Sequence, residues 1–78
     1  MIEQREIQIY VALLDEGTDV WRPVRAISAG YDVYTIISEN QHPEDEHWQF
    51  QTGDVVRCKL KTFSGGCKGL VAVEKVSG

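Results

Sequence analysis

Two cysteines, Cys58 and Cys67, carry the most reactive side chains of this 78-residue chain. They could form a disulfide, a redox pair or half of a metal site. The glycine-rich stretch 64–66 predicts a hairpin turn between them, in which Cys58 faces Val71 or Val73. The two sulfurs then lie several residues apart along the ladder, at about 3.3 Å per residue. Because a disulfide requires Cα atoms within about 7 Å, we expect two free thiols.

We predict that Cys58 is a small buried hydrophobe beside Val56 and Leu60, and that Cys67 is a loop thiol. Only a much longer loop, from Lys59 to Gly66, would bring the sulfurs together. The N-terminus shows no secretory signal, which predicts a cytoplasmic location where thiols stay reduced.

Histidines and carboxylates gather in the most polar stretch of the chain, residues 39–47. Imidazole and carboxylate groups are suitable ligands for zinc and other divalent ions. Their spacing matches no closed structural metal site, and no second cluster completes a tetrahedron. We therefore predict a solvated acidic loop without a metal, whose negative charge could face a basic partner. The side chains in question are His42, Glu44, Asp45, Glu46 and His47.

The chain offers few parts for catalysis. A cysteine nucleophile would need a histidine base, yet neither cysteine lies in a known motif, and both histidines lie in or beside the polar loop. Gly65-Gly66 and Gly69 lack the following lysine and the strand-to-helix context of a phosphate loop. Adjacent carboxylates such as Asp15 and Glu16 point to opposite faces of a strand. We predict no enzyme, no catalytic residue and no cofactor.

Charge is unevenly distributed along the chain, whose net charge is −4 at pH 7. Residues 1–54 carry eleven acids and three bases, whereas residues 55–78 carry five bases and one acid. Arg57, Lys59 and Lys61 alternate with apolar residues, so they share one solvent face of a strand. This basic stripe could bind RNA, single-stranded DNA or an acidic protein. It could equally be an ordinary solvated face that blocks edge pairing.

Length and composition limit these chemistries to one small domain, residues 1–78. A domain of this size buries only about 60–65% of the surface of its unfolded chain, which leaves little room for a deep catalytic cavity. The longest apolar run, Tyr10–Leu14, is far shorter than the about 20 residues of a membrane-spanning helix. The acidic balance argues against general duplex DNA binding, which relies on phosphate neutralisation.

Alternating apolar residues, broken by turn residues roughly 8–12 positions apart, predict an all-β domain. Pro23 cannot donate a ladder hydrogen bond, so it marks a sheet edge or a bulge. The turns are expected at Asp15–Thr18, Ala29–Asp32, Thr52–Asp54 and Phe63–Cys67. The five predicted strands are Glu6–Leu14, Asp19–Ala29, Tyr31–Ser38, Val55–Lys61 and Gly69–Val76, with a short extended piece at Trp48–Gln51.

Five short antiparallel strands in so short a chain predict a small barrel of the SH3-like type. An OB-like barrel is the alternative, but it usually needs a longer chain and often a helix between its third and fourth strands. The segment 39–47 occupies that place, and Pro43 permits at most one helical turn beginning there. The SH3-like arrangement is therefore favoured.

Two strings of residues carry a family resemblance. The first is LDEGTDVWRPV, from Leu14 to Val24, and the second is PEDEHWQF, from Pro43 to Phe50, followed by TGDVVRC from Thr52. Together they resemble a group of small, uncharacterised bacterial proteins with an SH3-like barrel fold. The resemblance spans about Tyr10–Val73 and implies the fold. It implies no activity, because a shared fold does not establish a function.

Shared parity on the alternating strands predicts which side chains form the core. Most of the seven aromatic residues should be buried in so small a domain, and those expected at the surface are Tyr34, Tyr10 or Trp48. The predicted core contains Ile7, Ile9, Val11, Val56, Leu60 and Val73.

These features predict a non-catalytic interaction module of unknown role, monomeric or weakly associating, that binds another protein. The alternative is weak binding of single-stranded nucleic acid through the basic C-terminal hairpin, since small barrels stack bases on aromatic side chains. The two functions differ in whether surface aromatics cluster with the basic or with the acidic residues. The candidate protein-binding residues are Glu44, Asp45, Glu46 and Trp48. The candidate basic surface comprises Arg57, Lys59, Lys61 and Lys68.

Overall fold

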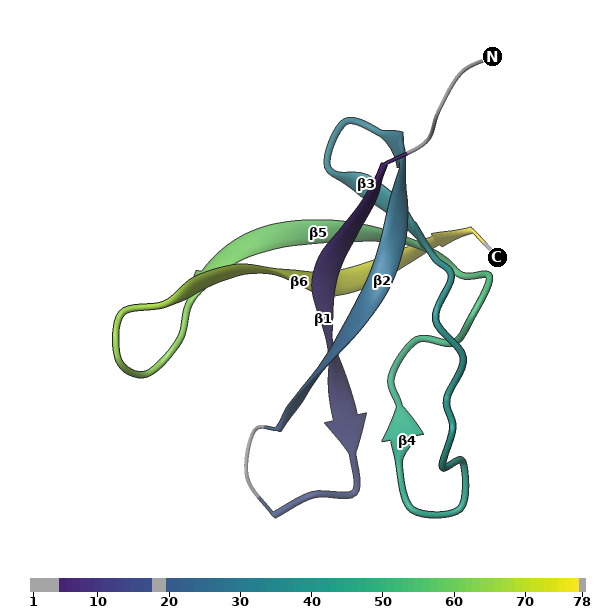
Figure 1. The fold of residues 1–78 in the computed structure, drawn as a ribbon, viewed down its shortest axis with the longest axis vertical. Helices are drawn as coiled ribbons and strands as arrows, with labels where there is room; N and C mark the ends of the chain where they lie inside the picture. Colours follow the sequence, from purple (N-terminus) through teal and green to yellow (C-terminus); the bar gives the residue numbers. More distant parts are fainter. Residues whose placement is uncertain (1–4, 18–19, 78) are drawn as a thin grey trace.

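The computed structural model describes residues 5–17 and 20–77, which form six β-strands in one sheet (Figure 1). Within these ranges there is no helix, so the predicted all-β class is confirmed, and no helix could span a membrane. The expected turn residue Thr18 and the expected strand start at Asp19 lie outside the described residues. The strands are β1 (Glu6–Leu14), β2 (Trp21–Gly30), β3 (Val33–Ile36), β4 (His47–Trp48), β5 (Val55–Thr62) and β6 (Lys68–Ser77).

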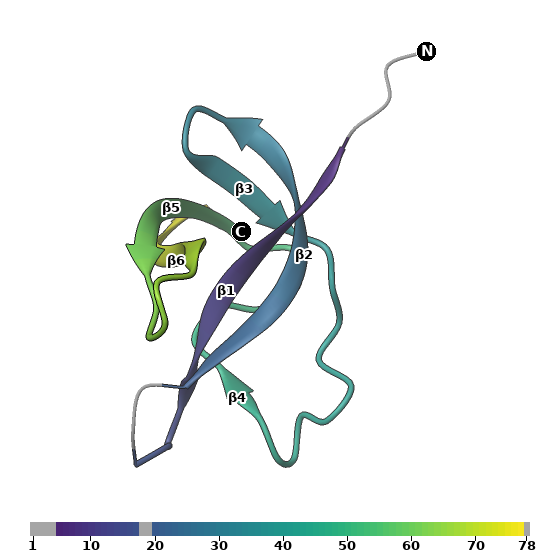
Figure 2. The ribbon, with the colours of Figure 1, turned by 60° about the vertical axis from the view of Figure 1, so that its left-hand side comes forward.

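Five of the strands pair in a ring, in the order β1, β2, β3, β5, β6 and back to β1. All neighbours in the ring are antiparallel except β6 and β1, which are parallel and meet at the pair Tyr10 and Val71. The sixth strand, β4, is the predicted extended piece at Trp48, and it pairs with the end of β1 at Leu13. Figures 1 and 2 show β1 and β2 as a long twisted pair. The β5–β6 hairpin crosses this pair, and its tip extends to one side of it (Figure 1).

The turns form where residues tolerate a left-handed backbone. Asp15, which follows the last residue of β1, has a φ of 63°, and the two-residue turn between β2 and β3 has Asp32 at φ 58°. Aspartate tolerates this region better than most residues. The β5–β6 loop has Gly65 and Gly66 at φ 87° and 88°, a conformation that glycine adopts without steric cost. The predicted turns at these three places are confirmed.

The β5–β6 hairpin has a register one residue away from either expected register. Cys58 pairs with Ala72, not with Val71 or Val73, because the loop between Thr62 and Lys68 contains five residues and is centred on Gly65. β6 also contains two bulges, since Val73 and Val76 are passed over in its pairing with β5. Each bulge adds one residue to β6, so the simple alternation of faces fails along this strand.

The core prediction is confirmed for Ile9, Val11 and Val56, which are fully buried, and Ile7 packs against them. It is wrong for Leu60, which is 60% exposed, because β3 pairs with β5 only as far as Arg57 and Leu60 lies beyond that point, where β5 pairs with β6. The tip of this hairpin projects from the other strands (Figure 1). The core prediction is also wrong for Val73, which is 46% exposed, because Val73 is a bulge residue. The other members of the core are Val24, Ala26, Ile36, Trp48, Phe50, Cys58 and Ala72.

Ile9→Ala should lower the free energy of unfolding by about 2–5 kcal/mol, because it leaves a cavity in a closed core. Leu60→Ala removes a side chain of the same size class from a mostly exposed position, so it should cost less than about 1 kcal/mol. Urea unfolding of the two variants measures the difference. Equal losses would contradict the projecting hairpin.

Candidate functional site

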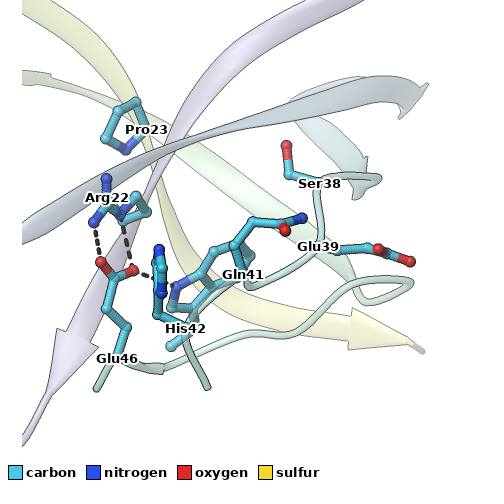
Figure 3. Close-up of a pocket in the computed structure, with 8 residues that line it drawn as sticks. Arg22, Pro23, Ser38, Glu39, Gln41, His42 and Glu46 are labelled. Atoms are coloured by element: carbon cyan, nitrogen blue, oxygen red, sulfur yellow. Dashed lines mark hydrogen bonds and ion pairs between the residues drawn. The ribbon is translucent and has the colours of Figure 1, made fainter. Parts of the chain in front are cut away.

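Arg22 lies on the inner side of the sheet, which is an unusual place for a charged residue. It pairs with the fully buried Val11 across the β1–β2 ladder, and paired residues project to the same face. Its guanidinium forms two hydrogen bonds with the Glu46 carboxylate, one of them 2.9 Å from Nε to Oε1 (Figure 3). The indole N–H of Trp48 donates to the same Oε1 at 3.1 Å. A bidentate, charge-assisted pair thus closes this end of the core.

The loop that carries Glu46 is held by its own backbone. The Asn40 side-chain amide donates to the Glu46 carbonyl at 2.7 Å, and its oxygen accepts from the His42 N–H at 2.9 Å. The Glu46 N–H donates to the His42 carbonyl at 2.8 Å, which closes one turn around Pro43. The loop therefore presents Glu44 and Asp45 outward from a fixed backbone.

These contacts divide the four predicted protein-binding residues into two pairs. Trp48 is only 5% exposed, so the expectation that it lies at the surface is wrong. The side chain of Glu46 is 16% exposed, and its charge is met by Arg22. Glu44 and Asp45 remain exposed to solvent. The sequence placed Trp48 at the surface because it follows a polar loop, whereas its pairing with Leu13 directs it inward.

A pocket of about 340 Å³ lies beside this cluster (Figure 3). It is open to solvent, and two of the charged side chains that line it, Arg22 and Glu46, already form an ion pair with each other. His42 lies at its rim, but the lining holds no cysteine or serine–histidine pair arranged for nucleophilic attack. The lining comprises Arg22, Pro23, Ser38, Glu39, Gln41, His42, Glu46 and Trp48.

The histidines of the polar loop do not converge on one point. His47 Nδ1 lies 3.0 Å from Asp15 Oδ2, at the end of β1, whereas His42 lines the pocket. Over residues 5–17 and 20–77, no three side chains of His, Cys, Asp or Glu gather closely enough to hold a metal ion.

A second cluster lies on the outer face of the sheet. Tyr10 alternates with the buried Ile9 and Val11 on β1, so its side chain lies on the outer face. Its ladder partner on β6 is Val71, which is buried, and Lys61 pairs with Gly69, two residues before Val71, so Lys61 projects to this same face. Trp21 shares this face, because it pairs with Ala12, two residues from Tyr10 on β1. The outer face of β1, β2 and the hairpin therefore carries aromatic and basic side chains together.

The aromatic side chains of this face contact one another. The ring of Phe63 lies 4.9 Å from that of Tyr10 and 6.2 Å from that of Trp21, measured between centroids. Lys61 Nζ lies 5.9 Å from the centre of the Trp21 ring, within the range of a cation–π interaction. A Cβ on Gly69 would lie 2.6 Å from Tyr10 Cε2, so only glycine lets Tyr10 lie across β6.

The predicted basic surface is therefore divided as well. Arg57 forms an ion pair with Glu74 on the neighbouring strand. Lys59 and Lys61 are exposed on the outer face, whereas Lys68 pairs with Thr62 and so projects from the opposite face of the hairpin. We call Lys59 and Lys61 with Tyr10, Trp21 and Phe63 the aromatic–basic face. The partly exposed aromatics thus cluster with lysines and not with the acidic loop.

Sequence reasoning missed Trp21 as a surface residue of interest. The signal was present in part, because Tyr10 has the outward parity of β1 and Gly69 interrupts β6 where an aromatic side chain crosses it. Tyr34, expected at the surface, instead packs against the core.

The two cysteines are free thiols, as predicted, with Cys58 buried and Cys67 exposed. Burial raises the pKa of the Cys58 thiol from 9.0 to about 11, and the negative charge of Asp32 adds to the shift. Cys58 is thus an inert core residue at neutral pH.

Glu46→Ala should lower the free energy of unfolding by about 1–3 kcal/mol, because it leaves the Trp48 indole N–H buried without an acceptor and removes the partner of Arg22. Glu44→Ala removes the same carboxylate from an exposed position and should cost less than about 0.5 kcal/mol. Thermal and urea unfolding of both variants measure the contrast. A loss in Glu44→Ala as large as that in Glu46→Ala would contradict the structural role of Glu46.

In the folded protein a thiol reagent at about pH 8 should label Cys67 quickly and Cys58 only on unfolding, because only the Cys67 thiol is accessible. Denatured, unreduced protein should show both thiols. Mass spectrometry after timed labelling counts them.

The raised pKa of Cys58 also predicts a pH dependence. Its contribution to stability is present below pH 9.0, the ordinary pKa, and declines as the pH rises toward about 11, because the unfolded chain loses this proton first. Cys58→Ala should remove that part of the alkaline decline, which urea unfolding between these pH values measures.

Comparison with known proteins gives no relative for this chain. No protein-family model matches it, and neither a curated protein nor a solved structure is significantly similar. The functional argument therefore depends on the geometry of the two clusters.

Proposed function

We propose that the protein is a non-catalytic interaction module that binds single-stranded nucleic acid weakly through the aromatic–basic face. The observation that carries this proposal is the position of Lys61 and Trp21 beside the packed pair Tyr10 and Phe63 on one outward sheet face. Single strands bind where bases can stack on aromatic rings next to cations that meet the phosphates. This arrangement favours the nucleic-acid function over the protein-binding function that the acidic loop suggested.

The charge of the chain sets the strength and salt dependence of this binding. The two exposed lysines of this face neutralise about two phosphates, which corresponds to a log–log salt slope of about −1.4 for a single strand. The net charge of −4 opposes the approach of a polyanion. We therefore expect affinities in the micromolar range or weaker at physiological salt.

We also propose that the ring of five strands is a small barrel of the SH3-like type. The five-strand ring and the single turn around Pro43, in place of a helix between β3 and β5, support this over an OB-like barrel. We further propose a bacterial source, which the sequence resemblance suggests, and a cytoplasmic location.

A protein partner at Glu44 and Asp45 is the second candidate function. It is favoured by the fixed backbone of the loop, which holds both carboxylates outward without a large ordering cost on binding. A basic partner would fit this surface, and a monomer or a weak homo-oligomer could present it.

Fluorescence anisotropy with a labelled single-stranded oligonucleotide tests the proposed function. The double variant Lys59→Glu, Lys61→Glu should weaken binding at least about tenfold at low salt and flatten the salt slope, because two phosphate contacts become repulsive. Arg5→Glu, Arg25→Glu is the matched control, since it changes the net charge equally toward the other end of β1 and β2.

The control variant should keep most of the wild-type affinity. Equal losses in the two double variants would mean that total charge alone matters. If neither the wild type nor the control variant binds the oligonucleotide, the nucleic-acid function is wrong. Capture of a basic protein, lost in Glu44→Lys, Asp45→Lys, would then favour the second candidate.

A further inference from the structure

The three aromatic residues of the aromatic–basic face are not equivalent. Tyr10 and Phe63 lie against each other at 4.9 Å with a 56° tilt, and Tyr10 also crosses the backbone of Gly69. The Tyr10 hydroxyl is held as well, because it accepts a 2.9 Å hydrogen bond from the Gln8 side chain. Both rings are therefore held in place by contacts within the protein.

Trp21 is placed differently. It meets Phe63 nearly at a right angle, with 78° between the ring planes, so Phe63 leaves at least one face of the Trp21 ring uncovered. The group that lies over the Trp21 ring is the ammonium of Lys61, 5.9 Å from the centroid. Lys61 is exposed and flexible, so it can leave that position without unfolding any strand.

We infer that Trp21 is the base-stacking residue of this face, and that Lys61 is an exchangeable cover that moves from the Trp21 ring to a phosphate when a base stacks. This inference rests on the proposed function. The positioning residues are Tyr10, Phe63 and Gly69. Trp21 contacts the Phe63 ring, which packs against Tyr10, and Tyr10 in turn lies over Gly69.

The exchange is favourable because stacking of a base on an indole is stronger than the attraction of one exposed ammonium to it. Lys61 does not lose its attraction on leaving, since the phosphate beside the stacked base replaces the ring. A base must be unpaired to offer its face to Trp21. The ligand class is therefore a single strand, or an unpaired loop, in preference to a duplex.

The experiment uses protein labelled with 5-fluorotryptophan, whose two fluorine resonances report Trp21 and Trp48 separately. Trp21→Leu assigns them. In the free protein, Lys61→Gln should shift the Trp21 resonance and leave that of the buried Trp48 unchanged. A thymidine oligonucleotide of about ten residues is within the usual site sizes. Its addition should shift the Trp21 resonance and leave the Trp48 resonance unchanged.

Affinities from anisotropy complete the test. Trp21→Leu should weaken binding roughly 5- to 100-fold, the range for loss of one stacked base, and Trp21→Phe should weaken it less because a smaller ring remains. Tyr31→Leu is the matched control, because Tyr31 is 92% exposed but lies in the turn between β2 and β3. It should bind like the wild type.

The outcomes separate the two claims. Binding by the wild type with an unmoved Trp21 resonance, or equal affinities for Trp21→Leu and Tyr31→Leu, overturns the inference and leaves the proposed function standing. An unchanged Trp21 resonance in Lys61→Gln overturns the claim that Lys61 covers the Trp21 ring. No binding by the wild type at millimolar oligonucleotide removes the proposed function and the inference together. The fluorine spectrum shows directly whether each variant is folded.

Discussion

One inward-facing arginine organises the polar end of this molecule. Arg22 extends from the core side of β2 because it pairs with Val11, and its side chain, 43% exposed, lies at the boundary between core and solvent. Glu46 provides the opposite charge there, and the indole N–H of Trp48 donates to the same carboxylate. The loop from Asn40 to Glu46 and the short strand β4 are joined to β2 through this one pair.

The same constraint decides which surface is available for a partner. The acidic loop looks like an interaction surface in the sequence, but half of its candidate residues are engaged in closing the core. The aromatic–basic face has the opposite character, because its contacts lie on the outside of the sheet and depend on the hairpin of β5 and β6. Stability and binding are thus assigned to opposite faces of the sheet, since the neighbouring residues Trp21 and Arg22 point to different sides of β2.

Local pattern was sufficient to predict the parts of the fold that repeat regularly. The strict alternation in Glu6–Leu14 gave both ends of β1 correctly, and the glycines after Phe63 located the hairpin turn. The errors at Val73 and Leu60 arose where the structure departs from regular geometry, through a bulge and through a hairpin that projects beyond its neighbours. Neither leaves a clear signal in the residues themselves.

The candidate site was harder to predict than the strands, because it depends on contacts between distant segments. Trp21 and Lys61 are forty residues apart in the sequence and meet only because β6 crosses β1 beside them. Likewise, Glu46 and Trp48 could be recognised as structural only once Arg22 was known to face inward. Composition and charge indicated that a basic surface existed but could not indicate which aromatic side chains accompany it.

The closure of the ring has a mechanical consequence. Among the described residues, β6 and β1 share one ladder pair, Tyr10 with Val71, whereas every other neighbouring pair in the ring shares several. A tensile load across the ring would therefore concentrate at this seam, and amide hydrogens there would exchange with solvent before those between β1 and β2. The Tyr10 ring of β1 lies over Gly69 of β6, so this side-chain contact also connects the two strands at the seam. The least reinforced joint of the ring thus lies directly beneath the aromatic–basic face.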